Sequence, residues 1–230
     1  MNNSIVFEDN ALIESKSKVI NKIKKTSYYL IKRSFDIITS IIGLIFILPL
    51  TILIKISYML TGDFNSIFFS QQRIGKNGKE FKLYKFRSMI PDANLELEKL
   101  LKENKDLRKE YQLNKKLKKD PRITKIGNIL RKTSLDELPQ VINILKGDMS
   151  IIGNRPYLPR EKKDMRENFD IIVKTKPGLT GYWQVSGRSD TTFNRRLELE
   201  KYYSLHAGLK LDIKIFFKTF IVVLLKKGAE

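Results

Sequence analysis

Residues 37–54 form an uncharged apolar run that contains one proline, Pro49. A helix rises about 1.5 Å per residue, so a run of this length extends roughly 27 Å, close to the roughly 30 Å hydrocarbon core of a bilayer. Lysine and arginine are frequent on both sides of the run, and flanks rich in these residues usually face the cytoplasm. The pattern predicts a membrane segment whose two flanks lie on the same side.

Pro49 suggests how both flanks reach one side. Proline removes a backbone donor and kinks a helix, so a re-entrant helix that dips into the membrane and returns satisfies both signals. Thr51 or Ser40 is expected to hydrogen-bond the carbonyl that the proline frees. An ordinary tilted spanning helix with a proline kink is the alternative that these residues leave open.

Length and charge agree with a membrane-surface protein. The chain has 230 residues, enough for one domain plus an anchor, and a formal net charge of +19. Such an excess calls for a polyanionic neighbour: anionic lipid headgroups, phosphorylated substrates or nucleic acid. The apolar run makes an anionic phospholipid membrane the preferred partner. The chain contains no cysteine, which excludes disulfides and thiolate metal sites.

The remaining pattern predicts a helix-rich α/β fold. Aromatic-rich runs at 64–69 and 81–86 flank a turn with glycine and asparagine at 73–79, which indicates a β-hairpin. Amphipathic helices are expected over 92–119, 123–131 and 135–145, the last ending at Gly147. The predicted organisation is a polar lead at 1–30, a re-entrant helix at 31–60 and a small cytosolic catalytic domain at 61–230.

The C-terminal segment at 209–227 predicts an amphipathic helix at the membrane interface. Lys210, Lys214 and Lys218 recur every four residues among leucine, isoleucine, phenylalanine and valine. Such a stripe suits the bilayer interface, where lysine stems extend toward the headgroups. A core helix with one solvent-facing side is the alternative.

The strongest candidate for chemistry lies at 134–140, in the sequence SLDELPQ. Ser134 followed three residues later by Glu137 has the spacing of a capping box. Asp136 would then lie in the first turn of the helix, where the helix dipole stabilises a negative charge. This structural reading needs no catalysis. The functional reading takes Asp136 and Glu137 as a catalytic carboxylate pair.

Cations at predicted turns and element ends favour the functional reading. A guanidinium group binds phosphate through two parallel hydrogen bonds, and glycine allows the backbone to approach the phosphate closely. A pyrophosphate site would need several such residues together. The candidates for substrate binding are Lys85, Arg87, Arg131, Arg155 and Arg188.

Together these segments resemble the bacterial sugar transferases, the monotopic polyprenyl-phosphate phosphoglycosyl transferases. The resemblance is carried by the kinked apolar run and by KRSFD at 32–36, YKFRSM at 84–89, RKTSLDELPQ at 131–140, GDMS at 147–150, GNRP at 153–156, PGLTG at 177–181 and WQVSGR at 183–188. Two positions depart from the family pattern. Leu48 precedes Pro49 where Ser-Pro is frequent, and Asn154 replaces a proline beside Arg155, which puts the rigidity of that loop in doubt. Larger relatives have an additional N-terminal membrane bundle, which this chain is expected to lack.

The resemblance implies transfer of a hexose 1-phosphate from a UDP-sugar to a polyprenyl (undecaprenyl) phosphate at the cytosolic face of the bacterial inner membrane. In the family the aspartate of an Asp-Glu pair forms a covalent phosphosugar intermediate in the presence of Mg²⁺. Asp136 occupies the position of that nucleophile and metal ligand, and Glu137 acts either as a base or as a second ligand. The motifs do not specify the sugar, the role of residues 1–30, or whether the chain is a monomer or a homo-oligomer.

Two other functional classes explain part of the sequence. A membrane-tethered nucleic-acid binder accounts for the charge and the aromatic content but leaves the acidic pair unused, so no nucleic acid is expected. A membrane scaffold accounts for the pair as a helix cap. His206, the only histidine, is expected to be a surface or packing residue, and Trp183 either packs or stacks on a base or sugar.

Overall fold

The computed structural model describes residues 2–114, 117–187 and 191–224 and confirms a helix-rich α/β architecture. Its helices and strands are α1 (Asn2–Leu60), β1 (Phe68–Ile74), β2 (Glu80–Phe86), α2 (Ala93–Glu103), α3 (Lys105–Asn114), α4 (Lys125–Lys132), α5 (Gln140–Lys146), β3 (Ser150–Ile152), α6 (Lys162–Met165), α7 (Phe169–Ile172), β4 (Gly178–Thr180), α8 (Phe193–His206) and α9 (Leu209–Leu224). Short 3₁₀ turns lie at η1 (Lys76–Gly78), η2 (Leu135–Glu137), η3 (Pro159–Glu161) and η4 (Arg166–Asn168).

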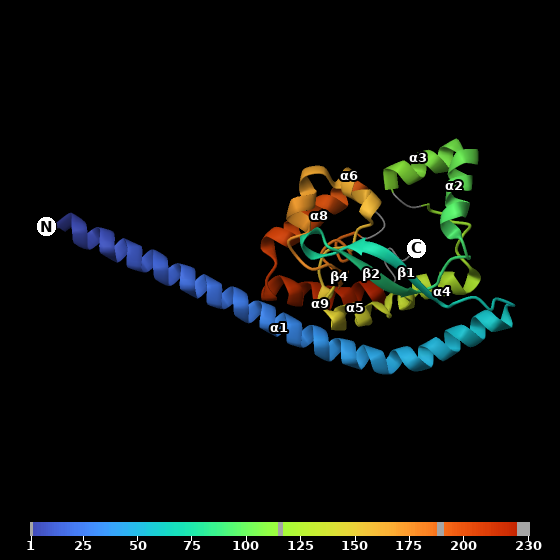
Figure 1. The fold of residues 1–230 in the computed structure, drawn as a ribbon, viewed down its shortest axis with the longest axis horizontal. Coiled ribbons are helices and arrows are strands. Elements are labelled where there is room, and N and C mark those ends of the chain that lie inside the picture. The colour runs from blue at the N-terminus through green and yellow to red at the C-terminus, as the bar shows by residue number, and fades with distance from the viewer. Residues whose placement is uncertain (1, 115–116, 188–190, 225–230) are drawn as a thin grey trace.

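Helix α1 joins the predicted polar lead and the predicted membrane helix into one element. Its segment Lys25–Leu60 is long and apolar enough to cross a membrane, with a mean hydropathy of 2.8 and only 11% of the most apolar part buried. Figure 1 shows that α1 extends far beyond the globular body and curves along its lower side. Among the described residues, no other helix has this length and hydropathy.

The expected side-chain compensation at Pro49 is wrong in detail. The proline frees the carbonyl of Ile45, four residues earlier, but the Thr51 hydroxyl donates to the carbonyl of Ile47 at 2.7 Å. The Ser40 hydroxyl is buried and has no hydrogen-bond partner among the described residues. Thr51 therefore caps a carbonyl that a regular helix would also bond, a contact that bends helices slightly.

The globular body contacts α1 on both sides of the apolar run. Before the run, Arg33 donates to the carbonyls of Ile144 and Leu145 at the end of α5, at 2.6 and 2.8 Å. Asp36 there accepts hydrogen bonds from the Ser150 hydroxyl and the Ile151 amide of β3. Beyond the run, the buried Tyr58 hydroxyl donates to the Arg87 carbonyl at 2.7 Å and lies 3.2 Å from the Thr124 hydroxyl. The one helix is thus fixed to the same body at two distant points.

The predicted hairpin is confirmed. Strands β1 and β2 pair antiparallel, with Phe68 opposite Phe86 and Phe69 opposite Lys85. Asn77 in the connecting turn has φ 58°, a left-handed conformation that asparagine tolerates better than most residues. The register brings Lys85 to the open end of the hairpin, close to η2.

Two short parallel strands, β3 and β4, support the loop that follows β3. Ser150 pairs with Gly178 and Ile152 with Thr180, and the pairing continues as a bridge between Asn154 and Pro177. Glycine is needed here because the two backbones approach closely. A Cβ on Gly153 would overlap the carbonyl oxygen of Lys176 and lie 2.7 Å from the amide nitrogen of Gly178.

Gly153→Ala is therefore expected to destabilise the protein by about 2 to 3 kcal/mol, because backbone atoms cannot move aside as a flexible side chain can. Thermal denaturation in detergent, followed by circular dichroism, measures the change. Gly208→Ala is the matched control, since its Cβ would meet only the His206 carbonyl oxygen at 3.8 Å. Equal melting temperatures for the two variants would contradict the close packing described here.

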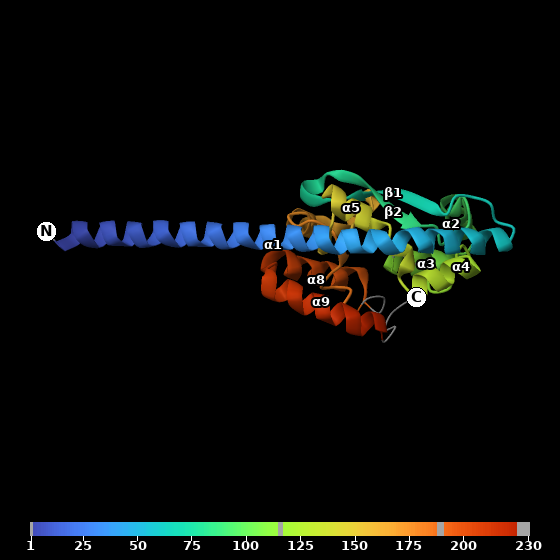
Figure 2. The same ribbon diagram turned by 90° about the horizontal axis from the view of Figure 1, so that it is seen from below.

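Helix α9 lies beside α1, as both ribbon views show. Figure 2 shows the two helices from below. The Lys32 ammonium contacts Asp212 at 2.5 Å, and the rings of Phe35 and Phe216 are 5.2 Å apart. One side of α9 is buried through Ile215, whereas the lysine stripe is exposed. A second, apolar stripe is also exposed: Leu209, Ile213, Phe217, Phe220 and Ile221. A core helix with one polar solvent face does not explain exposed phenylalanines, so the geometry favours the interfacial prediction.

Candidate functional site

The predicted carboxylate pair lies on the 3₁₀ turn η2, between α4 and α5. The capping-box reading is wrong. The Ser134 side chain makes no capping hydrogen bond, its φ of 57° is left-handed, and the regular helix begins later, at Gln140. A serine held in this region costs about 1 to 2 kcal/mol, which other contacts must offset. The turn instead buries Asp136 and leaves Glu137 half-buried.

Lys85 at the end of β2 joins the two carboxylates. Its ammonium donates to Glu137 Oε1 at 2.6 Å and lies 3.7 Å from Asp136 Oδ2. Burial raises the pKa of Asp136, against the opposing charge of Lys85, and the adjacent Glu137 carboxylate raises it further. Burial alone would raise the pKa of Glu137 too, but the charge and hydrogen bond of Lys85 lower it below its ordinary value. The two adjacent carboxyl groups thus differ in pKa: that of Asp136 is raised and that of Glu137 is lowered.

Two further predicted cations lie near the pair, and a third cation joins them. Arg131, in the last turn of α4, lowers the pKa of Asp136. Arg155 and Arg73 act in the same direction on Glu137, which places both guanidinium groups on the side of that carboxylate. Sequence reasoning assigned Arg73 only to a basic flank and a turn. Its position just before the glycines of the hairpin turn was the available signal.

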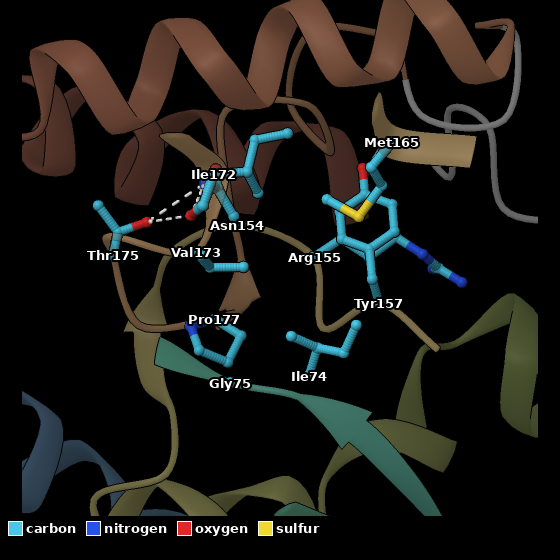
Figure 3. A pocket seen from close by; sticks show the side chains of 10 residues that line it. All are labelled: Ile74, Gly75, Asn154, Arg155, Tyr157, Met165, Ile172, Val173, Thr175 and Pro177. Carbon is cyan, nitrogen blue, oxygen red and sulfur yellow. Dashed lines mark hydrogen bonds between the residues drawn. The ribbon is translucent and has the colours of Figure 1, made fainter. Parts of the chain in front are cut away.

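The loop that carries Arg155 is anchored by its neighbour Asn154. The side-chain amide nitrogen of Asn154 lies 2.6 Å from the Ser204 hydroxyl, 3.2 Å from the Thr175 hydroxyl and 3.2 Å from the Ile172 carbonyl. Figure 3 shows Asn154 and Thr175 at one end of a small cavity, with Arg155 at the other. The side-chain hydrogen bonds of Asn154 therefore hold this loop in place, at the position where the family pattern has a rigid proline.

The backbone of Arg155 is fixed independently of its side chain. Its amide donates to both carboxylate oxygens of Glu200, at 3.0 and 2.9 Å. Glu200 lies on α8 and is almost completely buried, and burial raises its pKa to about 8. The only sequence signal for this residue is its helical spacing, four positions after Arg196.

Arg73, Arg155 and Arg196 form a crowded group, of which Arg73 and Arg155 also act on Glu137. Burial, followed by repulsion from Arg155, lowers the pKa of both Arg73 and Arg196 to about 10. The Nε atoms of all three are buried and have no hydrogen-bond partner among the residues that the structure describes. Within the described ranges the buried Tyr157 hydroxyl has no partner either. Buried donors without acceptors cost free energy, so this group is suited to receive an anion.

Trp183 packs against this group. The guanidinium of Arg196 lies 4.3 Å from the Trp183 ring centroid and that of Arg155 lies 5.8 Å away. The indole nitrogen donates to the Thr191 hydroxyl at 2.7 Å. The contacts favour the packing prediction for Trp183, with the ring holding two cations in place by cation–π attraction.

The other predicted residues lie elsewhere. Arg87 donates to Asp63 and to the carbonyls of Ser66 and Met89, and its guanidinium packs on the Tyr58 ring. It belongs to the junction between α1 and the hairpin. Arg188 lies outside the described residues. His206 is exposed and stacks on Tyr202, as predicted for a surface residue.

The described side chains offer Mg²⁺ only a partial set of ligands. Among the described residues, no group of three or more histidine, cysteine, aspartate and glutamate side chains could hold a metal ion. Mg²⁺ is commonly bound by one or two carboxylates together with substrate phosphates and water. Asp136 and Glu137 supply such a partial set, which fits a metal ion that binds together with a diphosphate.

Comparison with known proteins gives a consistent assignment. The model of the family described as bacterial sugar transferase matches residues 27–226. The undecaprenyl-phosphate galactose phosphotransferase of Salmonella typhimurium is 43% identical over 212 residues, which cover 92% of this chain and 44% of that protein. The exopolysaccharide production protein ExoY of Sinorhizobium fredii is 40% identical over 86% of this chain and 87% of its own length. The UDP-glucose:undecaprenyl-phosphate glucose-1-phosphate transferase of Escherichia coli is 36% identical over 87% of this chain and 41% of its own length.

The chain thus spans less than half the length of some relatives and most of the length of others. The family match includes the hairpin, the carboxylate turn and the arginine group, so it extends over all the parts that build the site. We conclude that the chain belongs to the bacterial sugar transferase family.

Proposed function

We propose that the protein transfers a hexose 1-phosphate from a UDP-sugar to a polyprenyl phosphate, as a membrane step of surface glycan assembly. The observation that carries the proposal is the buried Asp136, which lies beside Lys85 and Glu137 on a turn that caps no helix. Relatives whose names include transfer to undecaprenyl phosphate support the acceptor. A scaffold has no need for a strained turn that buries a carboxylate.

The proposed reaction has two steps on one phosphorus atom. In the first, an Asp136 oxygen attacks the phosphorus that bears the sugar, the bond from that phosphorus to the bridging oxygen breaks, and UMP leaves with that oxygen. In the second, an oxygen of the polyprenyl phosphate attacks the same phosphorus and releases Asp136. The raised pKa of Asp136 suits this role, because a more basic carboxylate is a better nucleophile.

The cations would stabilise the negative charge of the donor. Lys85 is within reach of both carboxylates and can hold Asp136 in position as charge moves to the departing phosphate. Arg155 and Arg73, whose buried Nε atoms find no acceptor in the described part of the chain, would receive the diphosphate oxygens. Arg131 would contact the acceptor or the donor phosphate on the Asp136 side.

Mg²⁺ would be held by Asp136, with Glu137 as the second carboxylate, and would offset the repulsion between the nucleophile and the diphosphate. Glu137 has an alternative role as the base that deprotonates the acceptor phosphate. Its lowered pKa favours the ionised form that either role requires.

The contacts of α1 support a re-entrant helix with both flanks at the cytosolic face of the inner membrane. Asp36 and Tyr58 lie 22 residues apart in this helix, about 33 Å along its axis, and both bind the same globular body. If the helix crossed the membrane in a straight line, the globular body bound at both points would have to lie within the hydrocarbon core. The many charged residues of that body make this position too costly. A bent helix that dips in and returns avoids this cost and holds Asp136 near the headgroups.

Intact-mass analysis tests the covalent step. The purified protein is incubated with Mg²⁺ and single UDP-sugars in the absence of lipid acceptor. We expect a mass gain of one hexose phosphate with the correct donor, lost again when polyprenyl phosphate is added. Absence of both an adduct and nucleotide release with every donor, lipid included, would refute the proposed function.

A further inference from the structure

Glu200 is a buried carboxylate to which the proposed reaction gives no role. It lies on α8, is 1% exposed, and follows Arg196 by four residues, so the two side chains share one face of the helix. A buried carboxylate needs hydrogen-bond donors from the protein, because water no longer supplies them. The donor to Glu200 is the backbone amide of Arg155, which lies 3.0 and 2.9 Å from its two oxygens. This contact joins a distant helix to the loop that carries Arg155.

The loop is held by backbone hydrogen bonds on both sides of Arg155. Before it, the Asn154 carbonyl accepts from an amide at the start of β4 at 2.7 Å. After it, the Tyr157 carbonyl accepts from an amide at the end of β1 at 2.8 Å. Between these two points the Arg155 amide donates to Glu200. Glu200 therefore fixes the peptide unit from which the Arg155 side chain extends.

The Arg155 side chain needs a fixed backbone because it lies among like charges. Burial, followed by repulsion from Arg155, lowers the pKa of both Arg73 and Arg196. The guanidinium of Arg155 lies 5.8 Å from the Trp183 ring centroid, and its buried Nε has no acceptor within the described ranges. Repulsion between such cations favours a side chain that turns away from the other two. An anchored amide opposes this movement.

The contact requires an acceptor more than it requires a negative charge. Burial raises the pKa of Glu200 to about 8, although the charges of Arg155 and Arg196 favour the ionised form. The neutral acid is therefore well tolerated at this position. A neutral side chain that keeps an oxygen in the same place should hold the Arg155 amide nearly as well.

We propose that Glu200 is a positioning residue for the reaction with the sugar nucleotide: its oxygens hold the Arg155 amide and so direct the Arg155 guanidinium toward the diphosphate. The inference rests on the proposed function, since Arg155 is the group through which Glu200 acts. A displacement of about 1 Å in a catalytic group can lower a rate by roughly 100-fold. Glu200 itself contacts neither substrate, so its effect should disappear when the Arg155 side chain is replaced.

Two substitutions of Glu200 test the assignment. Glu200→Met removes both acceptors and keeps an unbranched side chain of similar length, whereas Glu200→Gln keeps one acceptor oxygen. Each is made alone and together with Arg155→Gln. The kcat/KM for the UDP-sugar that labels the wild-type protein is measured as UMP release, and the melting temperature is recorded. Glu198→Gln is the matched control, because Glu198 is exposed on the same helix and pairs with Arg195.

We expect Glu200→Met to lower kcat/KM by about 10-fold to 100-fold and Glu200→Gln to stay within about fivefold of the wild type. In the Arg155→Gln background, Glu200→Met should lower kcat/KM by less than about twofold further, because no guanidinium is left to position. Glu198→Gln should match the wild-type protein.

An equal loss from Glu200→Met with and without the Arg155 side chain would show a general structural role and would overturn the assignment. A loss of more than about fivefold in Glu200→Gln would also overturn it, and this variant decides the question if Glu200→Met does not fold. Failure of the wild-type protein to release UMP from every donor would instead refute the proposed function.

Discussion

Asp136→Asn is expected to lower the rate of UMP release by roughly a thousandfold or more and to abolish the phosphosugar adduct. An amide of the same shape cannot supply the electron pair that the first step requires. The fold should survive, because burying the carboxylate is already unfavourable and Lys85 keeps its stronger contact, at 2.6 Å, with Glu137. Nucleotide release and intact mass measure the chemistry, and thermal denaturation measures the fold.

Asp170→Asn provides the control for this substitution, since Asp170 is exposed in α7, outside the site. It should match the wild-type protein in rate and melting temperature. Adduct formation by Asp136→Asn at the wild-type rate would exclude Asp136 as the nucleophile. An adduct that disappears only in Glu137→Gln would transfer that role to Glu137.

Arg155→Gln is expected to lower kcat/KM for the sugar nucleotide by about 100-fold to 1,000-fold, because it removes a preorganised donor from the diphosphate site. The position of the loop should not change. Glu200 binds the backbone amide of residue 155, and Asn154 anchors the adjacent position, so neither contact involves the side chain that is replaced. Steady-state kinetics with varied donor concentration measures the effect.

Arg195→Gln is the matched control, because Arg195 is an exposed arginine on α8 that pairs with Glu198 at 2.6 Å. Its kcat/KM should stay within a factor of about two of the wild type, as the pair is solvent-exposed. If Arg155→Gln lowered the melting temperature and left kcat/KM unchanged, Arg155 would have only a structural role.

Much of the architecture could be predicted from local patterns. The apolar run, the hairpin around the glycine-containing turn, and the helix end at Gly147, where φ is 88°, all depend on residues close together in the chain. The match of motifs to a known family also named the carboxylate pair. The capping-box prediction was wrong because it uses only the spacing of the two side chains. The backbone of Ser134 adopts a left-handed conformation, and its side chain makes no capping hydrogen bond.

The arginine group could be predicted only in part. Arg131 and Arg155 were identified by their neighbours in sequence, but Arg73 and Arg196 come from a hairpin and a distant helix, and nothing local brings them to Glu137 or Trp183. Arg87 has the same sequence signal as Lys85, two residues earlier. Strand alternation does not separate these two residues; β2 ends at Phe86, and beyond it the ion pair with Asp63 and the contact with the Tyr58 ring hold Arg87 toward α1 instead.

The sequence by itself determined that this chain contains an apolar segment long enough for a membrane, carries a large positive charge and contains an acidic pair in a family-specific motif, because each depends on composition or on neighbouring residues. The tertiary structure alone decided which cations surround that pair and that both flanks of the apolar run bind one body. These features depend on contacts between residues tens to hundreds of positions apart, and such contacts form only when packing of the whole chain fixes the direction of each side chain.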